Sequence, residues 1–125
     1  MTTLRETTTD ASESDTDPDA GPDGLIAEPN GEGTLVRMWG SVDESLRTQA
    51  SAVMARALGR PGPVVVDAAG LDFLDSSGLA FLLQLVRAAR EDGRAVVLRD
   101  PPDLVVEMLQ VLGLGDEVPL EFSSR

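Results

Sequence analysis

The middle of the chain changes its hydrophobic pattern from that of a strand to that of a helix within residues 71–83. Upstream lies the β-branched run 64–66, which is typical of a short strand buried on both faces. Downstream, apolar residues recur with the spacing of one helical face, at Leu79, Leu82, Leu83, Val86 and Ala89. The change of period predicts a corner at residues 75–78, where a buried strand gives way to a helix.

Three polar residues, Asp75, Ser76 and Ser77, occupy this corner. Their side-chain oxygens can accept the free backbone N–H groups of the first helical turn, so the cluster fits a helix N-cap. The positive end of the helix dipole also favours an anion at the same place. The residues alone therefore permit a purely structural cap or a functional site.

The core of residues 71–79, an apolar residue followed by Asp-Ser-Ser-Gly-Leu, resembles the signature of the STAS family, the sulfate transporter and anti-sigma factor antagonist domain. In stand-alone bacterial members, a partner kinase that doubles as an anti-sigma factor phosphorylates the Ser after this Asp. The resemblance implies that Ser76 is the phosphorylated residue and that Ser77 is a capping or packing hydroxyl.

A second segment matches the family more loosely. Many stand-alone members carry Gly-Glu-Leu-Asp where this chain has Gly40, Ser41, Val42 and Asp43, so Ser41 replaces the Glu. Asp43 can be a helix cap in competition with Ser41, which has Glu44 three residues on as in a capping box. The resemblance implies instead that Asp43 lies beside Ser76 and shapes the recognition site.

The order of elements predicts an α/β fold. We expect a hairpin of strands 25–27 and 34–39 with a five-residue loop, and Gly40 is expected to end the second of these strands. The expected elements that follow are helix 44–58, strand 63–67, a helix to residue 91, strand 95–98, a third helix after Pro102 and an edge strand at 118–122. Strands that alternate with helices imply right-handed crossovers. The expected architecture is a STAS-like mixed sheet of four to five strands with three helices on one face.

Composition divides the chain into two parts. Residues 1–24 hold seven acidic residues and almost no apolar ones, so we expect a disordered acidic tail that solubilises the protein or tethers a basic partner. The STAS domain is expected at residues 25–125.

Several classes of function are disfavoured by the residues that the chain lacks. It has no Cys and no His, which excludes disulfides, thiolate or imidazole metal sites and histidine-dependent triads, and we expect no cofactor and no enzymatic activity. A net charge of −12 opposes nucleic-acid binding. Because neither a membrane span nor a signal peptide is evident, we expect a soluble, cytoplasmic protein.

The helix after the corner is apolar further round than one buried stripe requires, because Phe81 and Leu85 lie beside that stripe, four residues apart. Either both are buried, or they form an interface patch next to Ser76. The candidate partner-binding residues are Asp43, Asp75, Ser76, Ser77, Gly78, Phe81 and Leu85.

Two functions follow from the resemblance. The first is an anti-sigma factor antagonist, monomeric when free, which binds an anti-sigma factor or switch kinase until Ser76 is phosphorylated and is reset by a phosphatase. The second is a non-switching STAS subunit that docks on a transporter ATPase or joins a stress-signalling assembly.

Overall fold

The computed structural model describes residues 21–123. Most of the segment expected as an acidic tail lies outside this range, and its last residues contact the fold. The indole Nε1 of Trp39 donates a hydrogen bond to the Gly21 carbonyl at 3.0 Å, and the backbone N–H of Ser41 donates to Asp23 Oδ1 at 2.8 Å. The first strand begins directly afterwards, at Gly24.

Five strands and three α-helices follow one another in the expected order. Their bounds are β1 Gly24–Asn30, β2 Gly33–Val42, α1 Arg47–Leu58, β3 Val64–Leu74, α2 Ser76–Glu91, β4 Val96–Arg99, α3 Asp103–Val111 and β5 Leu120–Glu121. A 3-10 turn, η3 Glu44–Leu46, precedes α1. Between residues 21 and 123, no helix is both long and apolar enough to cross a bilayer.

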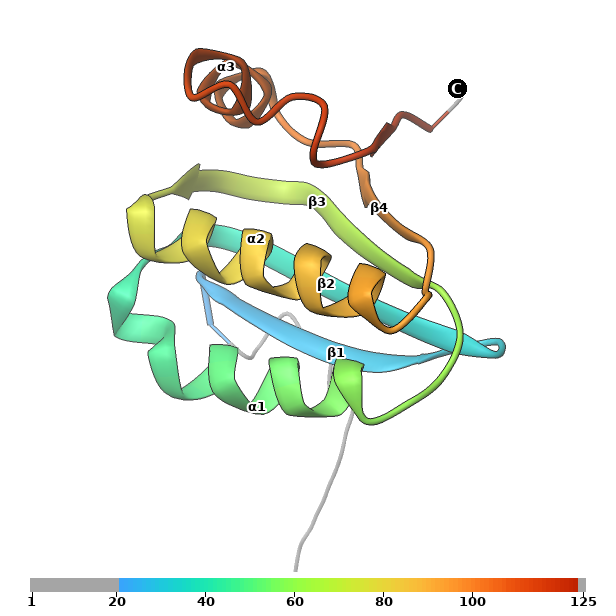
Figure 1. The fold of residues 1–125 in the computed structure, drawn as a ribbon. Coiled ribbons are helices and arrows are strands. Elements are labelled where there is room, and N and C mark those ends of the chain that lie inside the picture. The colour runs from blue at the N-terminus through green and yellow to red at the C-terminus, as the bar shows by residue number, and fades with distance from the viewer. Residues whose placement is uncertain (1–20, 124–125) are drawn as a thin grey trace, which may run out of the picture.

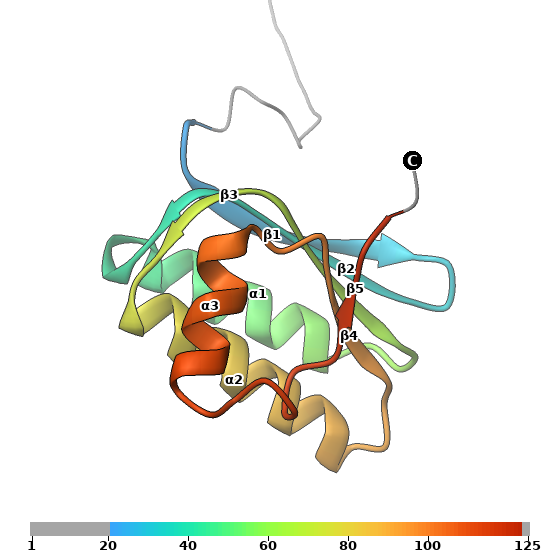
Figure 2. The same cartoon turned by 90° about the horizontal axis from the view of Figure 1, so that it is seen from above.

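The strands form one mixed sheet in the order β1-β2-β3-β4-β5. β1 pairs with β2 antiparallel, and the remaining neighbours are parallel. Figures 1 and 2 show the helices on one face of this sheet, with α1 alongside β1 and α2 in front of the central strands. The expected fold class is confirmed.

Two expectations about the first strands were wrong. The hairpin loop has two residues rather than five, because Asn30 pairs with Gly33 and Gly31 adopts φ +61°. Gly40 does not end β2: it adopts φ +69° at a register irregularity against β3, and the strand continues to Val42. Glycine tolerates this backbone conformation, so the strand bends there instead of stopping.

β3 also differs from the expected short, doubly buried strand. It runs to Leu74 instead of ending at Asp67, because the extended end of β2 supplies a partner for its second half. Val64 and Val66 are buried under the helices, whereas Val65 on the other face is half-buried. The helices therefore cover only one face of the sheet.

Trp39 lies on the helix-free face between two glycines. Its neighbours across the sheet are Gly24 on β1 and Gly70 on β3. A Cβ atom at Gly24 would lie 2.6 Å from the indole ring. The absence of a side chain at Gly24 is therefore what allows the ring to pack over β1.

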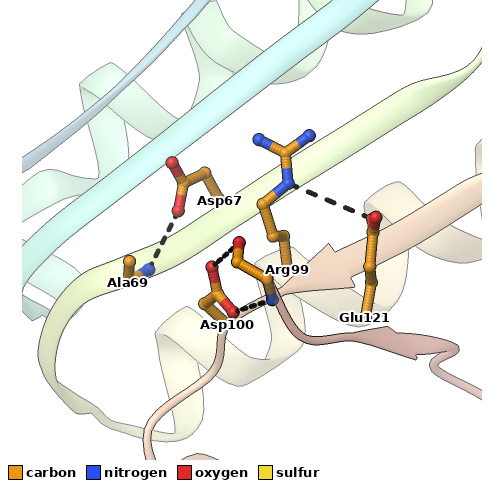
Figure 3. Close-up of polar contacts among 6 residues, drawn as sticks. Asp67, Ala69, Arg99, Asp100 and Glu121 are labelled. Atoms are coloured by element: carbon orange, nitrogen blue, oxygen red, sulfur yellow. Dashed lines mark hydrogen bonds and ion pairs between the residues drawn. The ribbon is translucent and has the colours of Figure 1, made fainter. Parts of the chain in front are cut away.

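The short strand β5 is anchored by side chains at its ends (Figure 3). Asp100, which adopts φ +53°, accepts hydrogen bonds at 2.6 Å from both the backbone N–H and the hydroxyl of Ser123. Arg99 and Glu121 form an ion pair at 4.0 Å across β4 and β5. These contacts hold the last described residues against the sheet.

Two arginines connect helices to neighbouring segments. The guanidinium of Arg94 donates to the carbonyls of Ala57 at 2.7 Å and Leu58 at 3.0 Å, at the end of α1. A cation at this end of a helix also complements the helix dipole. Arg87 on α2 makes a two-bond ion pair with Glu117, which precedes β5.

Candidate functional site

The corner between β3 and α2 is capped by its aspartate. Asp75 is the N-cap residue of α2, and its Oδ1 accepts a hydrogen bond from the backbone N–H of Gly78 at 2.9 Å. Ser76 is the first residue of the helix and is exposed, while Ser77 is half-buried. Within residues 21–123, no hydrogen bond engages the Ser76 hydroxyl. The cap interpretation therefore holds for Asp75 and leaves the Ser76 hydroxyl accessible.

Gly78 has a packing role. A Cβ atom there would lie 2.7 Å from the Val42 carbonyl oxygen and 2.5 Å from Cδ1 of Leu74. Because Gly78 is buried against the ends of β2 and β3, the expectation that it contacts a partner is replaced by a role in helix placement. The close approach presses the first turn of α2 onto the end of β2.

The end of β2 is also hydrogen-bonded to the corner. The backbone N–H of Asp75 donates to the Val42 carbonyl at 3.3 Å, and Val42 pairs with Leu74 across the parallel strands. Asp43, the next residue after Val42, therefore leaves the sheet beside the start of α2. This arrangement brings together the two segments that resemble the STAS family.

Asp43 is the N-cap of η3. Its Oδ1 accepts hydrogen bonds from the Ser45 hydroxyl at 2.6 Å and from the Ser45 backbone N–H at 2.9 Å. These bonds, that of the hydroxyl first, lower the pKa of the Asp43 carboxyl below its ordinary value. Asp43 is therefore ionised at neutral pH. The cap interpretation of Asp43 is confirmed, and the competing cap at Ser41 was wrong.

A groove of about 520 Å³ runs between α1 and α2 from this corner. Asp43 and Ser77 line it together, whereas Ser76 lies outside its lining. Its further walls come from η3 (Glu44) and from both helices: Arg47, Ala50, Ser51, Met54, Ala55, Leu58, Ala80, Phe81 and Gln84. The groove is thus mostly apolar along its length, with Ser51 and Gln84 as polar residues there, and it is charged at the end near the corner.

The structure decides between burial and exposure for Phe81 and Leu85. Phe81 is 7% exposed and Leu85 is 0% exposed, so both belong to the core. A patch of the two exposed side chains was therefore wrong, because Leu85 has no accessible surface and Phe81 has very little. Phe81 still contributes to the lining of the groove, while Leu85 does not.

The α1 wall of the groove was missed from the sequence. Ala50 and Met54 pack against the core on one side and are only half-buried. Small residues at Ser51 and Ala55, one helical turn apart, hollow the surface beside them. This run of small side chains was the available signal.

The mixed sheet with helices on one face and a capped serine corner defines a STAS-like α/β domain. A family model described as "Mlab, STAS domain" matches residues 28–121. Since this match spans most of the chain, the protein belongs to the STAS domain family. A search of curated protein sequences gave no match.

Solved structures give the same architecture. The anti-sigma factor antagonist SpoIIAA in its unphosphorylated form is similar with a TM-score of 0.68 and 21% identity, over 82% of this chain and 90% of that one. The Bacillus cell fate determinant SpoIIAA in the phosphorylated form gives 0.66 and 22%, over 82% and 93%. An anti-sigma factor antagonist from Mycobacterium paratuberculosis gives 0.60 and 25%, over 79% and 85%.

Proposed function

We propose that this protein is an anti-sigma factor antagonist controlled by phosphorylation of Ser76. In its unphosphorylated form it binds an anti-sigma factor that is also a serine kinase, and a sigma factor is thereby released. Phosphorylation of Ser76 ends the binding, and a phosphatase restores it. The protein acts in the cytoplasm by binding rather than by catalysis.

The observation that carries this proposal is the exposed Ser76 hydroxyl directly after the capping residue Asp75. A kinase needs an accessible hydroxyl, and Ser76 at the capped helix start is exposed. The likeness to structures described as unphosphorylated and phosphorylated SpoIIAA supports control by phosphorylation, without naming the residue.

Electrostatics explains how phosphate at Ser76 changes binding without unfolding the domain. A phosphoserine adds about −1.5 to −2 charges. The first turn of α2 stabilises that charge through its free N–H groups and its dipole. Before phosphorylation, a partner at this corner meets the carboxylates of Asp75 and Asp43. After phosphorylation of Ser76, the same partner meets a much more negative surface. Partner groups that are acidic or closely packed against Ser76 are then repelled.

The groove between α1 and α2 is the surface that we assign to the partner. It begins at Asp43 and Ser77 and continues over Ala50, Met54 and Phe81. We expect an apolar side chain of the partner to enter the groove while a donor group reaches the Asp43 carboxylate.

The test combines phosphosite mapping with a binding titration. The full chain is incubated with its cognate kinase and ATP, and the phosphate is located by mass spectrometry. We expect phosphate on Ser76 and loss of binding by the phosphorylated form. Phosphate on Ser77 alone would move the site by one residue and refute the assignment.

A second candidate is a constitutive STAS subunit that docks on a transporter ATPase or in a stress-signalling assembly. The observation that favours it is that Ser77 lines the groove and Ser76 does not, so a ligand of the groove need not sense Ser76. No phosphate anywhere, with unchanged binding by a Ser76→Asp variant, would support this candidate over the switch.

A further inference from the structure

The outer face of α3 leaves large apolar side chains uncovered. Five such side chains are exposed between residues 21 and 123, and three of them belong to α3 or its C-cap. Leu104 is 44% exposed, Val111 83% and Leu112 55%. The other two, Phe73 and Phe122, lie singly on other segments. Single apolar residues are ordinary on a protein surface, but a group of them on one short helix indicates a contact surface.

The helical spacing gathers these side chains on one face. Four apolar residues of the segment recur at i, i+4, i+7 and i+8, and we call this set the α3 stripe: Leu104, Met108, Val111 and Leu112. Val105 and Leu109 project from the neighbouring face of α3 and are buried in the core. The core therefore covers one apolar face of α3, and the α3 stripe is a second apolar face that stays exposed or half-buried.

The α3 stripe is separate from the groove that we assign to the switch partner. Figures 1 and 2 show α2 between α1 and α3 in the helical layer. The groove is lined by residues of η3, α1 and α2 and by none of α3. A protein bound to the α3 stripe therefore leaves the groove free, and nothing in the proposed switch requires the stripe.

The charge beside the α3 stripe has one sign. From residue 100 to residue 123 the chain holds six acidic residues and no Lys or Arg. Asp103 and Glu107 are exposed on α3, on the side of the stripe that is turned away from the core. Neither forms an ion pair within residues 21–123, whereas Glu117 is paired with Arg87. An apolar stripe with an acidic flank complements a partner whose apolar side chains are flanked by Lys or Arg.

The same charges disfavour the other occupants of such a face. Two copies of the domain would face each other with acidic residues on both sides, and like charges across an interface repel. Residues 1–20 hold six acidic residues and one Arg, so the same repulsion acts against this segment of the chain. Helices that lie on lipid surfaces are rich in Lys and Arg on their polar face, and α3 has neither.

We propose that the α3 stripe docks a basic amphipathic helix of a second partner protein. The apolar face of that helix packs on Leu104, Val111 and Leu112, and its Lys or Arg side chains pair with Asp103 and Glu107. An amphipathic helix supplies apolar anchors at the same spacing as the α3 stripe. The domain would then be held by one partner at α3 while the Ser76 corner binds and releases another.

The test is a titration of the full chain, labelled with ¹⁵N, with two synthetic peptides of about 14 residues. One peptide has Leu at the positions of one helical face and Lys elsewhere, and the other has Glu in place of every Lys. We expect the Lys peptide to cause saturable shifts of the Leu104, Glu107 and Val111 amide signals. The Glu peptide should cause none, and added NaCl should weaken the Lys peptide because salt screens the ion pairs.

Two pairs of variants locate the binding on α3. Val111→Gln removes the most exposed side chain of the α3 stripe and should weaken the Lys peptide at least tenfold, whereas Phe122→Gln removes an exposed apolar side chain elsewhere and should bind as the parent does. Glu107→Lys should also weaken binding at least tenfold. Glu32→Lys makes the same change of charge in the β1–β2 loop and should have little effect.

Four results would overturn the proposal. Equal binding of the Glu peptide would show that charge does not select the partner. Equal losses from Glu32→Lys and Glu107→Lys would show that the peptide follows the overall charge. Self-association of the full chain in sedimentation, abolished by Val111→Gln, would show that a second copy covers the stripe. Co-sedimentation with phosphatidylglycerol vesicles that depends on Val111 would show that the stripe binds lipid.

Discussion

Gly78 at the start of α2 lies against the backbone carbonyl of Val42 so closely that a Cβ atom at Gly78 would sit 2.7 Å from that oxygen. This contact joins two segments that are more than thirty residues apart in the chain. It holds the helix start that carries Ser76 against the strand end that leads into Asp43. The geometry of the candidate site therefore depends on a residue that has no side chain.

Gly78→Ala should destabilise the domain. The added methyl group meets the Val42 carbonyl and Leu74 Cδ1, and overpacking of this kind costs about 1–3 kcal/mol. Alanine has a higher helix propensity than glycine, which stabilises the variant by up to about 1 kcal/mol. A net decrease in the free energy of unfolding would therefore show that the steric contact outweighs this gain. Urea denaturation measures the difference. Gly115→Ala is the control, since nothing lies within 4 Å of its added Cβ, and it should be nearly neutral.

Ser76→Ala should fold normally and still bind the kinase partner, but it cannot be phosphorylated at this position. Because Asp75 provides the cap, we expect its free energy of unfolding to change by less than about 0.5 kcal/mol. Ser76→Asp should also fold and bind the partner at least tenfold more weakly, a loss of about 1.4 kcal/mol. Isothermal titration with the partner measures both. Ser77→Ala is the matched control and should keep phosphorylation at Ser76.

Asp43→Asn tests whether this residue does more than cap. The Asn side-chain carbonyl can accept the same hydrogen bonds from Ser45, and Asn caps about as well as Asp, so stability should hardly change. If the charge of Asp43 takes part in recognition, partner affinity or the rate of phosphorylation should fall while Tm holds. If the variant keeps both the partner affinity and the phosphorylation rate of the parent, Asp43 has a structural role alone.

The Arg87–Glu117 pair predicts a defined dependence of stability on pH. The hydrogen bond from Arg87 lowers the pKa of Glu117 in the folded protein. The stabilisation that Glu117 gives the folded protein is therefore complete at pH values above its unfolded-state pKa of about 4.3. It is lost as the pH falls through the lower pKa of the folded state. Between about pH 5 and pH 2, Tm of the parent should fall more steeply than that of Glu117→Gln. Equal slopes would mean that the pair does not persist in solution.

Removing residues 1–20 should leave Tm within a few degrees of the full chain, as expected for an acidic segment that buries little surface. Removing residues 1–23 should cost more, because it deletes the acceptors of Trp39 and Ser41. Each lost hydrogen bond is worth about 1 kcal/mol, or roughly 4–8 °C for a domain of this size. Calorimetry of the two truncations gives the comparison, and a large loss from the shorter cut would show that the tail packs on the domain.

The element order was predictable because each segment carries its own local signal. The helical spacing after Leu79 and the β-branched run at 64–66 depend only on near neighbours in the chain, and both elements formed where they were expected. The length of β3 was not predictable in this way. Residues 68–74 are strand because β2 continues past Gly40 and pairs with them, which is a relation between distant segments.

In the candidate site, too, the features that depend on near neighbours in the chain were predictable, and those that depend on distant segments were not. Asp75 could be recognised as a cap from its position before an apolar helix, and the structure confirms this role. The joint lining of one groove by Asp43 and Ser77 depends on the pairing of Val42 with Leu74, which no local pattern reports. The burial of Leu85 was equally undetermined, because an apolar residue beside a buried stripe can face a core or a partner.

Trp39, the single tryptophan of the chain, is an intrinsic fluorophore whose emission reports on one side of the sheet only. Its indole N–H is bonded to Gly21, and its ring lies over Gly24 on the side of the sheet away from the helices. Emission should therefore shift to longer wavelength when the first strand detaches and water reaches the ring. Occupation of the groove between α1 and α2, on the opposite side of the sheet, should leave the emission maximum where it is.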